Sequence, residues 1–194
     1  MKAALVVLVL LLPAGSVSAA VFSDGIAALE AKNFPGALAV FGPLAAQGNG
    51  DAQFMLGVMH ENGLGVPQDM GSAASWYLKA AETGVASAQY NIGVFYQLGT
   101  GVAVDPAAAR HWLSKAAEQG HHRAQNNLGT MYYTGGGADR DPVEALKWLT
   151  LAAEGLQGEA RDITLQNVAA IKKELSADEA AEAARRVAAW KSLR

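Results

Sequence analysis

The feature that most constrains the fold is a gap-free repeat with a period of 36 residues. Three related segments start 36 residues apart: AQFMLGVMHENGLG at 52–65, AQYNIGVFYQLGTG at 88–101 and AQNNLGTMYYTGGG at 124–137. Downstream, the same spacing relates an aspartate, an alanine, a tryptophan and an Ala-Ala-Glu triplet in each unit. A fixed period of this length predicts supersecondary units that stack on one another and bury a shared core.

Each unit is predicted to contain two helices. In the first unit, residues 52–62 carry apolar or small side chains at i, i+4, i+7 and i+8, which places them on one helix face. The second helix covers about 69–83, with Asp69 as its N-cap and a glycine just past its end. In the later units Pro106 and Pro142 take the first helical position, where proline costs little.

The repeat frame weakens on both sides. The flanking helices are expected at 23–31, 35–47, 158–174 and from 177 to about 190. Ser176, with Glu179 three residues later, forms a capping box that opens the last helix. We therefore expect an all-α fold, a right-handed α/α solenoid of stacked antiparallel helix pairs. The expected boundaries are a signal peptide at 1–19 and a single solenoid at 20–194, divided into a capping pair at 20–51, full repeats at 52–87, 88–123 and 124–159, and capping helices at 160–194.

The first twenty residues differ in character from the rest. Lys2 is their one charge, residues 3–12 are unbroken apolar sequence, and small residues follow. This order is typical of a secretory signal peptide. Cleavage is expected after Ala19, with Ala20 as the second choice. The apolar run is shorter than the ~20 residues that cross a bilayer, so we expect no stable membrane insertion after cleavage.

Charge and cysteine content restrict the partners and the chemistry that can be expected. Without Lys2 the chain carries 14 basic and 18 acidic residues, a formal charge of −4, and no basic cluster. Nucleic acid is therefore not an expected partner. The chain has no cysteine, which excludes disulfides, thiolate metal sites, thiol catalysis and lipidation at a cleavage-site cysteine. A periplasmic or secreted protein is expected.

The repeated residues resemble a known family. The pattern A-x-A-Q-x-x-L-G-x-x-Y-x-x-G-x-G-V, followed by D-x-x-x-A-x-x-W and A-A-E-Q-G, is similar to the Sel-one-like repeat, a longer relative of the tetratricopeptide repeat. The loop at 65–69 is close to the family pattern, whereas 135–138 departs from it. The resemblance implies an adaptor or scaffold with a concave binding surface, lined by the first helices. Some disulfide-rich secreted relatives are described as penicillin-binding or β-lactamase-like, and the absence of cysteine separates this chain from them.

No motif for catalysis, a cofactor or a metal emerges from the remaining residues. Gly99 and Gly101 follow a helix and have no lysine nearby, so a turn is favoured over a phosphate loop. His60 aligns with Tyr96 and Tyr132 and is expected in the core. His121 and His122 lie in the predicted loop between units and make a weak metal site by themselves. Ser176 is interpreted as a cap, not as a nucleophile.

The mid-helix glycines and the recurring tryptophans are both expected to serve packing between helices. Mid-helix Gly57, Gly93 and Gly129 each cost about 1 kcal/mol of helix propensity relative to alanine, so we expect the partner helix to approach them closely. The tryptophans at 76, 112 and 148 could form a ligand-binding row, but their fixed place in each second helix favours packing between helices.

Positions that vary between units while sharing one helix face are free to meet a partner. On the first helix of each repeat, these variable positions are spaced i, i+4 and i+7. They are Phe54, Val58 and Glu61; Tyr90, Val94 and Gln97; and Asn126, Thr130 and Tyr133. We call these nine residues the stripe. The sequence thus favours a non-catalytic scaffold that binds a protein or peptide through the stripe. The alternatives are a hydrolase of cell-wall or β-lactam substrates, a carbohydrate-binding envelope module, and a stripe whose Phe54 and Tyr90 are too buried to bind.

Overall fold

The computed structural model describes residues 14–137 and 139–193, so residues 1–13 of the predicted signal peptide lie outside it. Within that part of the chain there are ten helices and no strand. The helices are α1 (Ala14–Glu30), α2 (Phe34–Ala46), α3 (Gly50–Asn62), α4 (Met70–Glu82), α5 (Ala86–Leu98), α6 (Pro106–Glu118), α7 (His122–Thr134), α8 (Pro142–Gly155), α9 (Gly158–Glu174) and α10 (Ala177–Ser192).

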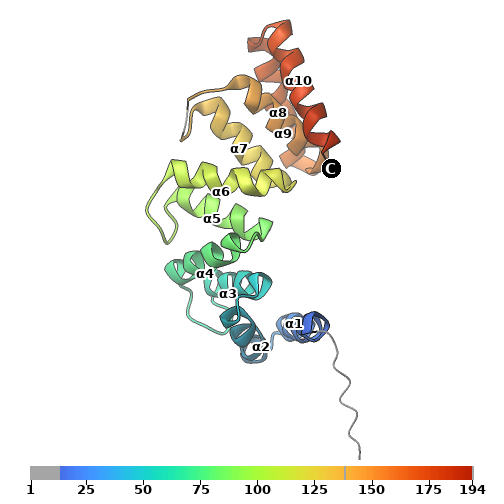
Figure 1. Ribbon diagram of the computed structural model, residues 1–194. Coiled ribbons are helices and arrows are strands. Elements are labelled where there is room, and N and C mark those ends of the chain that lie inside the picture. Colours follow the sequence, from blue (N-terminus) through green and yellow to red (C-terminus); the bar gives the residue numbers. More distant parts are fainter. Residues whose placement is uncertain (1–13, 138, 194) are drawn as a thin grey trace, which may run out of the picture.

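The helices stack in chain order into an elongated solenoid, from α1 and α2 at one end to α10 at the other (Figure 1). From α1 to α9 each helix packs against its neighbours in the chain, whereas α10 packs chiefly against α8. The predicted all-α solenoid is therefore confirmed. No helix in the described part of the chain is both long and apolar enough to cross a membrane.

Aspartate caps begin the second helix of every repeat. The side chain of Asp69 accepts hydrogen bonds from the Gly71 and Ser72 amides, Asp105 caps α6 in the same way, and Asp141 caps α8 by accepting from the Glu144 amide. Pro106 and Pro142 are the first residues of those helices, where no amide donor is needed. These caps confirm the helix starts predicted from the repeat.

The first helices begin two residues earlier than expected from the sequence. They start at Gly50, Ala86 and His122 because the N-caps lie at residues 49, 85 and 121. Asn49 caps α3 by accepting from the Ala52 amide, and His121 caps α7 through its ring nitrogen. The interpretation of residues 121–122 as loop was thus wrong for His122, which is helical. Helix α1 also begins before the expected residue 23.

Glycine permits the two helices of a repeat to approach closely. A Cβ atom built on Gly93 would lie 2.8 Å from Cγ of Leu113 and 3.3 Å from the carbonyl oxygen of Ala109, both on α6. Gly57 and Gly129 face Tyr77 and Leu149 in the same manner. The predicted packing role of the mid-helix glycines is confirmed.

The Gly-x-Gly that follows each first helix is a turn. Gly99 ends α5 with φ of 73°, and Gly101 follows with φ of 67°. A Cβ atom on Gly101 would lie 2.2 Å from the carbonyl oxygen of Met70, the first residue of α4. The loop therefore packs onto the start of the preceding repeat's second helix, which explains the second glycine without a phosphate ligand.

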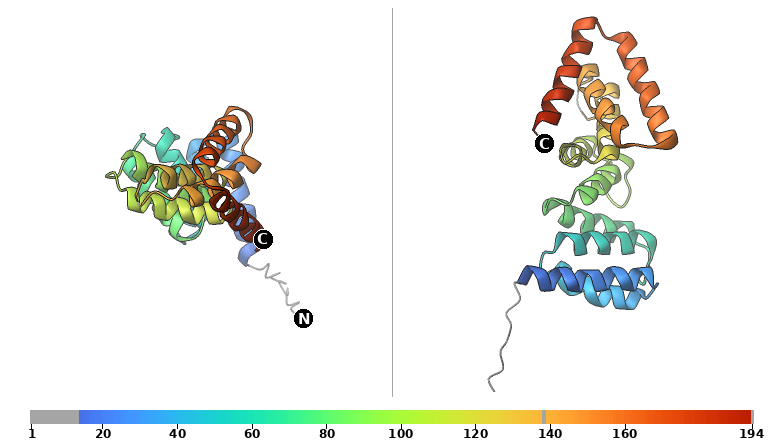
Figure 2. Two further views of the ribbon diagram at one scale, coloured as in Figure 1. Left: turned by 90° about the horizontal axis from the view of Figure 1, so that it is seen from above. Right: turned by 90° about the vertical axis from the view of Figure 1, so that its right-hand side faces the viewer.

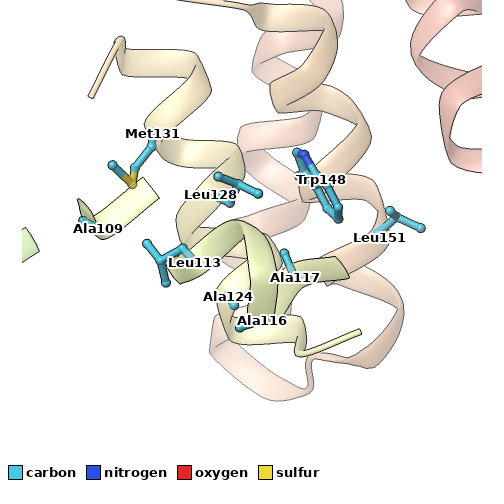
Figure 3. Close-up of a cluster of buried hydrophobic side chains, with 9 residues drawn as sticks. All are labelled: Ala109, Leu113, Ala116, Ala117, Ala124, Leu128, Met131, Trp148 and Leu151. Carbon is cyan, nitrogen blue, oxygen red and sulfur yellow. The ribbon is translucent and has the colours of Figure 1, made fainter. Parts of the chain in front are cut away.

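Alanine and larger apolar side chains together fill the core between repeats. One cluster joins α6, α7 and α8 and is shown in Figure 3. Its members are Ala109, Leu113, Ala116, Ala117, Ala124, Leu128, Met131, Trp148 and Leu151. Trp148 is buried, while Trp76 and Trp112 are half-buried against neighbouring clusters. The tryptophans therefore serve packing, as predicted, and do not form an open aromatic row.

A buried glutamine ties each repeat to the one before it. Gln53, Gln89 and Gln125 donate to the carbonyl oxygens of Ala45, Ala81 and Ala117, at 3.1, 3.1 and 3.2 Å. Each acceptor lies in the last turn of the preceding second helix, where carbonyls lack intrahelical partners. The recurring glutamine thus fixes the spacing between successive repeats.

The last two helices form an inverted V that encloses α8 (Figure 2, right). On α10, Arg186 makes an ion pair with Glu144 of α8 at 2.9 Å, and Trp190 meets Trp148 edge to face at 6.3 Å. Ser176 and Glu179 form the predicted capping box at the start of α10. These contacts close the core at the carboxyl-terminal end of the stack.

Candidate functional site

The stripe lies on the three first helices α3, α5 and α7, but its members are not equally accessible. Gln97 and Thr130 are exposed. The other seven are half-buried. The stripe is therefore neither a buried layer nor an open surface, and its aromatic residues have to be considered one by one.

The aromatic residues of the stripe pack partly inward. The Phe54 ring lies 5.6 Å from that of Tyr77. The Tyr90 ring stacks on the imidazole of His121, with centroids 4.6 Å apart and planes inclined by 25°. Val58 and Val94 pack against the neighbouring cores. Each of these side chains keeps part of its surface open to solvent, so Phe54 and Tyr90 can still contact a ligand.

Other members of the stripe already have partners within the chain. The carboxylate of Glu61 accepts a hydrogen bond from the Tyr77 hydroxyl. The hydroxyl of Tyr133 donates to Glu174 on α9, and this bond to the carboxylate raises the pKa of Tyr133. Arg140 also binds Glu174 and lies over the Tyr133 ring at 4.7 Å. The variation of these positions between repeats is therefore explained, at least in part, by the fold.

Two hollows open on the face of the first helices. The larger has a volume of about 530 Å³ and runs from α3 across α5 to the start of α7 and the α8–α9 connection. It is lined by Phe54, Ser87, Tyr90, Asn91, Gly120, His121, His122, Arg123, Gly155 and Leu156. The second, of about 390 Å³, is lined by Tyr90, Arg123, Asn126, Asn127, Leu156, Ala160, Ile163 and Thr164.

Because the hollows share Tyr90, Arg123 and Leu156, they form one continuous depression, which we call the α7 groove. It includes three members of the stripe, Phe54, Tyr90 and Asn126, and leaves the other six outside its lining. The structure thus brings together one side chain from each of the three first helices that the stripe joins.

His121 is held in one orientation at the head of α7. Its Nδ1 atom accepts from the Ala124 amide at 3.2 Å, which satisfies one of the free donors at the helix start. Burial lowers the pKa of His121, and the neighbouring Arg123 and His122 lower it further. The ring is therefore neutral near pH 7, and since Nδ1 is an acceptor, its proton is on Nε2.

Arg123 supplies the positive charge of the groove. It is exposed, it lines both hollows, and no described carboxylate lies within ion-pair distance of it. No aspartate or glutamate lines either hollow. Across the rest of the chain, acidic residues outnumber basic ones, so the groove is a local exception to the overall charge.

Sequence reasoning did not single out Arg123 because it placed the start of α7 at residue 124. With the helix beginning at His122, Arg123 lies three residues before Asn126, on the same face and one turn earlier. The equivalent positions in the other repeats are Asp51 and Ser87. This position therefore varies between repeats as the stripe does, and the same criterion would have found it.

The described residues contain no cluster of metal ligands. No group of three histidine, aspartate or glutamate side chains there could hold a metal ion. His60 is half-buried, like the aligned Tyr96 and Tyr132, and so lies at the edge of the core and not fully within it as expected; His111 is exposed on α6. The groove offers hydrogen-bond donors, apolar walls and a cation, which are features of a binding surface.

The comparisons with known proteins agree with this architecture. Residues 50–85, 86–121 and 122–155 match the family model described as the Sel1 repeat. A Sel1 repeat protein from Oxalobacter formigenes has a similar crystal structure, with a TM-score of 0.69 and 37% identity over 76% of this chain and 59% of that one. No curated protein matches the sequence.

A protective antigen of uropathogenic Escherichia coli with an SLR fold is also similar, at a TM-score of 0.52 and 29% identity. The match covers 89% of this chain and 45% of the antigen. The chain thus spans about half the length of the solved structures that it resembles.

Proposed function

Because the chain belongs to the Sel1 repeat family, we propose that it is a non-catalytic adaptor of the bacterial envelope or the extracellular space, which binds a protein or peptide on the face of its first helices. Sel1 repeat proteins are generally scaffolds for protein–protein interaction and typically lack catalysis. The family supports the scaffold role, whereas the binding face and the location are our proposal.

The observation that carries the proposal is the α7 groove. It lies on the face where side chains vary between repeats, and it joins half-buried aromatic rings to a free cation. Aromatic residues and arginine that are partly desolvated commonly dominate the energy of protein interfaces. Tyr90 lines both hollows, so we expect it to contribute most.

Binding is tested by capture of partners from envelope extracts with the purified mature chain. Tyr90→Ala is expected to lose the captured partner while remaining folded by circular dichroism, and Tyr133→Ala tests the far end of the stripe. Glu118→Ala, an exposed change on α6 outside the groove, is the control and should capture normally. A Tyr90→Ala protein that captures as well as wild type would contradict the proposed face.

Two alternatives predict different results with the same protein. A β-lactam hydrolase would turn over nitrocefin, and a carbohydrate-binding module would be retained by envelope polysaccharides. The proposed adaptor does neither. Turnover above the uncatalysed rate, or polysaccharide retention that Tyr90→Ala abolishes, would replace the proposal.

The proposed location rests on the signal-peptide pattern of the first twenty residues. Expression of the whole chain with a carboxyl-terminal tag, followed by fractionation, should place it in the periplasm or the medium. Its amino terminus is expected to be Ala20, or Val21 for the second cleavage choice. A cytoplasmic product that retains Met1 would refute the location.

A further inference from the structure

We propose that the α7 groove recognises an internal acidic residue of an extended peptide, an aspartate or glutamate next to an aliphatic side chain, with Arg123 as its ion-pair partner. This inference rests on the proposed function and specifies the chemistry of the partner. Four observations support it: the charge of the groove, its amide donors, its exposed apolar side, and the place of Arg123 along it.

The charge of the groove favours an anionic ligand. Its lining contains one guanidinium and no carboxylate, in a chain that otherwise has an acidic surplus. Arg140, Arg185 and Arg186 are paired with carboxylates of Glu174, Glu144 and Glu182, whereas Arg110 and Arg161, which line neither hollow, have no ion pair in the described structure. Arg123 has no such partner in the described structure, so its paired donors remain available to a ligand carboxylate.

The polar lining places side-chain amides beside the guanidinium. The Oδ1 atom of Asn126 already accepts a hydrogen bond from the Thr164 hydroxyl at 2.8 Å, which leaves the amide nitrogen to donate. Asn127 is half-buried and lines the same hollow. Free amide donors next to a guanidinium suit peptide carbonyls that flank a carboxylate.

The apolar side of the groove provides a place for an aliphatic neighbour. Ile163 on α9 is 50% exposed, and it lines the second hollow with Leu156 and Ala160. An aliphatic side chain placed there would cover Ile163 and lose its own exposure to water.

The position of Arg123 distinguishes an internal acidic residue from a terminal carboxylate. Arg123 lines both hollows, so it lies where they join and not at a closed end. A peptide bound through a side-chain carboxylate at this point can continue in both directions, toward Phe54 on one side and toward Ile163 on the other. A chain terminus would leave one of the two hollows empty.

The test is selection of a displayed peptide library on the full mature chain, followed by titration of synthetic peptides. We expect the selected peptides to share an aspartate or glutamate beside an aliphatic residue. Replacement of that acid by its amide should weaken binding to the wild type about tenfold or more. Amidation of the peptide's terminal carboxyl should leave the affinity unchanged.

Arg123→Gln is expected to bind the acidic peptide and its amide analogue equally, while Arg123→Lys keeps part of the preference. Arg110→Gln on α6, outside the groove, is the matched control and should retain the full preference. Because Arg123 is exposed, both variants should fold, which circular dichroism checks.

Peptides that need Tyr90 but show no acid preference would overturn this inference and leave the proposed function standing. A preference that survives Arg123→Gln, or that follows the terminal carboxyl, would also overturn it. Selected peptides that bind Tyr90→Ala as tightly as wild type would instead contradict the proposed binding face.

Discussion

The hydroxyl of Tyr77 on α4 donates a hydrogen bond to the carboxylate of Glu61 on α3, within the first full repeat. Tyr77 is fully buried and takes the position that Leu113 and Leu149 occupy in the next repeats. Burial and the adjacent carboxylate raise the pKa of Tyr77 well above its usual range. An aromatic residue at a leucine position is thus accommodated by a polar partner one helix away.

This pair predicts coupled effects of Tyr77→Phe and Glu61→Gln on stability. A hydrogen bond to a charged group contributes about 1.5–3 kcal/mol to the free energy of unfolding, so each single change should destabilise. The double variant should lose about 1–2 kcal/mol less than the sum of the two. Urea unfolding of the four proteins measures this coupling. Strict additivity would show that the bond contributes nothing to folding.

Substitution of Gly93 should destabilise the protein even though it improves helix propensity. Alanine would gain about 1 kcal/mol of propensity, but its Cβ atom would lie 2.8 Å from Leu113, and overpacking typically costs ~1–3 kcal/mol. We expect a net loss for Gly93→Ala and a severe loss for Gly93→Leu. Thermal unfolding is the measurement, and an unchanged melting temperature for Gly93→Leu would refute the packing role.

Gly42 supplies the control for that experiment. It lies inside α2, and a Cβ atom there would meet nothing within 4 Å. Gly42→Ala should therefore stabilise the protein by up to about 1 kcal/mol. If Gly93→Ala destabilises the protein and Gly42→Ala stabilises it, the effect of close packing is separated from that of helix propensity.

Acidification should weaken the start of α7. The pKa of His121 is lowered in the folded state by burial and by its basic neighbours Arg123 and His122. The unfolded chain therefore binds a proton at higher pH than the folded one. Stability is expected to fall as pH drops below about 6.5, the ordinary histidine value, and to level off below the folded pKa.

His121→Asn isolates this effect. Asparagine is a favoured N-cap and does not titrate, so the variant should keep α7 and lose this part of the pH dependence. His111→Gln, at an exposed site on α6, should retain it. Urea midpoints between pH 7.5 and pH 5 measure the difference. Equal slopes for wild type and His121→Asn would exclude His121 as the source.

Removal of a buried glutamine should loosen one boundary between repeats. Gln89 donates to the Ala81 carbonyl and accepts from Gln119, so Gln89→Ala leaves buried polar groups without partners. The expected cost is about 1–3 kcal/mol. Hydrogen exchange should show the largest increase at the α4–α5 junction, and a uniform increase over the whole chain would contradict a local role.

The recurring parts of the fold could be predicted because each structural position occurs once in every repeat. The sequence therefore shows three times which residue type that position requires. Asp69 and its equivalents identify the helix starts, and Gly93 and its equivalents identify the close helix crossings. The stripe was harder to predict, because variation between repeats has two causes. Glu61 differs from its equivalents since Tyr77 is its partner, and Tyr133 binds Glu174, which lies beyond the repeats. Neither contact is visible in the repeat frame.

The groove was only partly predictable for a geometric reason. Sequence periodicity locates a helix face well but its first turn poorly, because the caps of α5 and α7 are not the usual ones. Val85 caps α5 without a side-chain hydrogen bond, and His121 caps α7 in place of the common serine, aspartate or asparagine. Arg123 therefore fell outside the predicted helix, although it shares a face with Asn126.

The stacking of each helix on its neighbours in the chain has a mechanical consequence. With few contacts between distant repeats, a small rotation at each interface can add up along the stack while every local core stays intact. The solenoid should therefore be elastic, and a change in its superhelical pitch should widen or narrow the α7 groove. A partner that is slightly too wide or too narrow can be accommodated by elastic bending, shared among interfaces, without local unfolding.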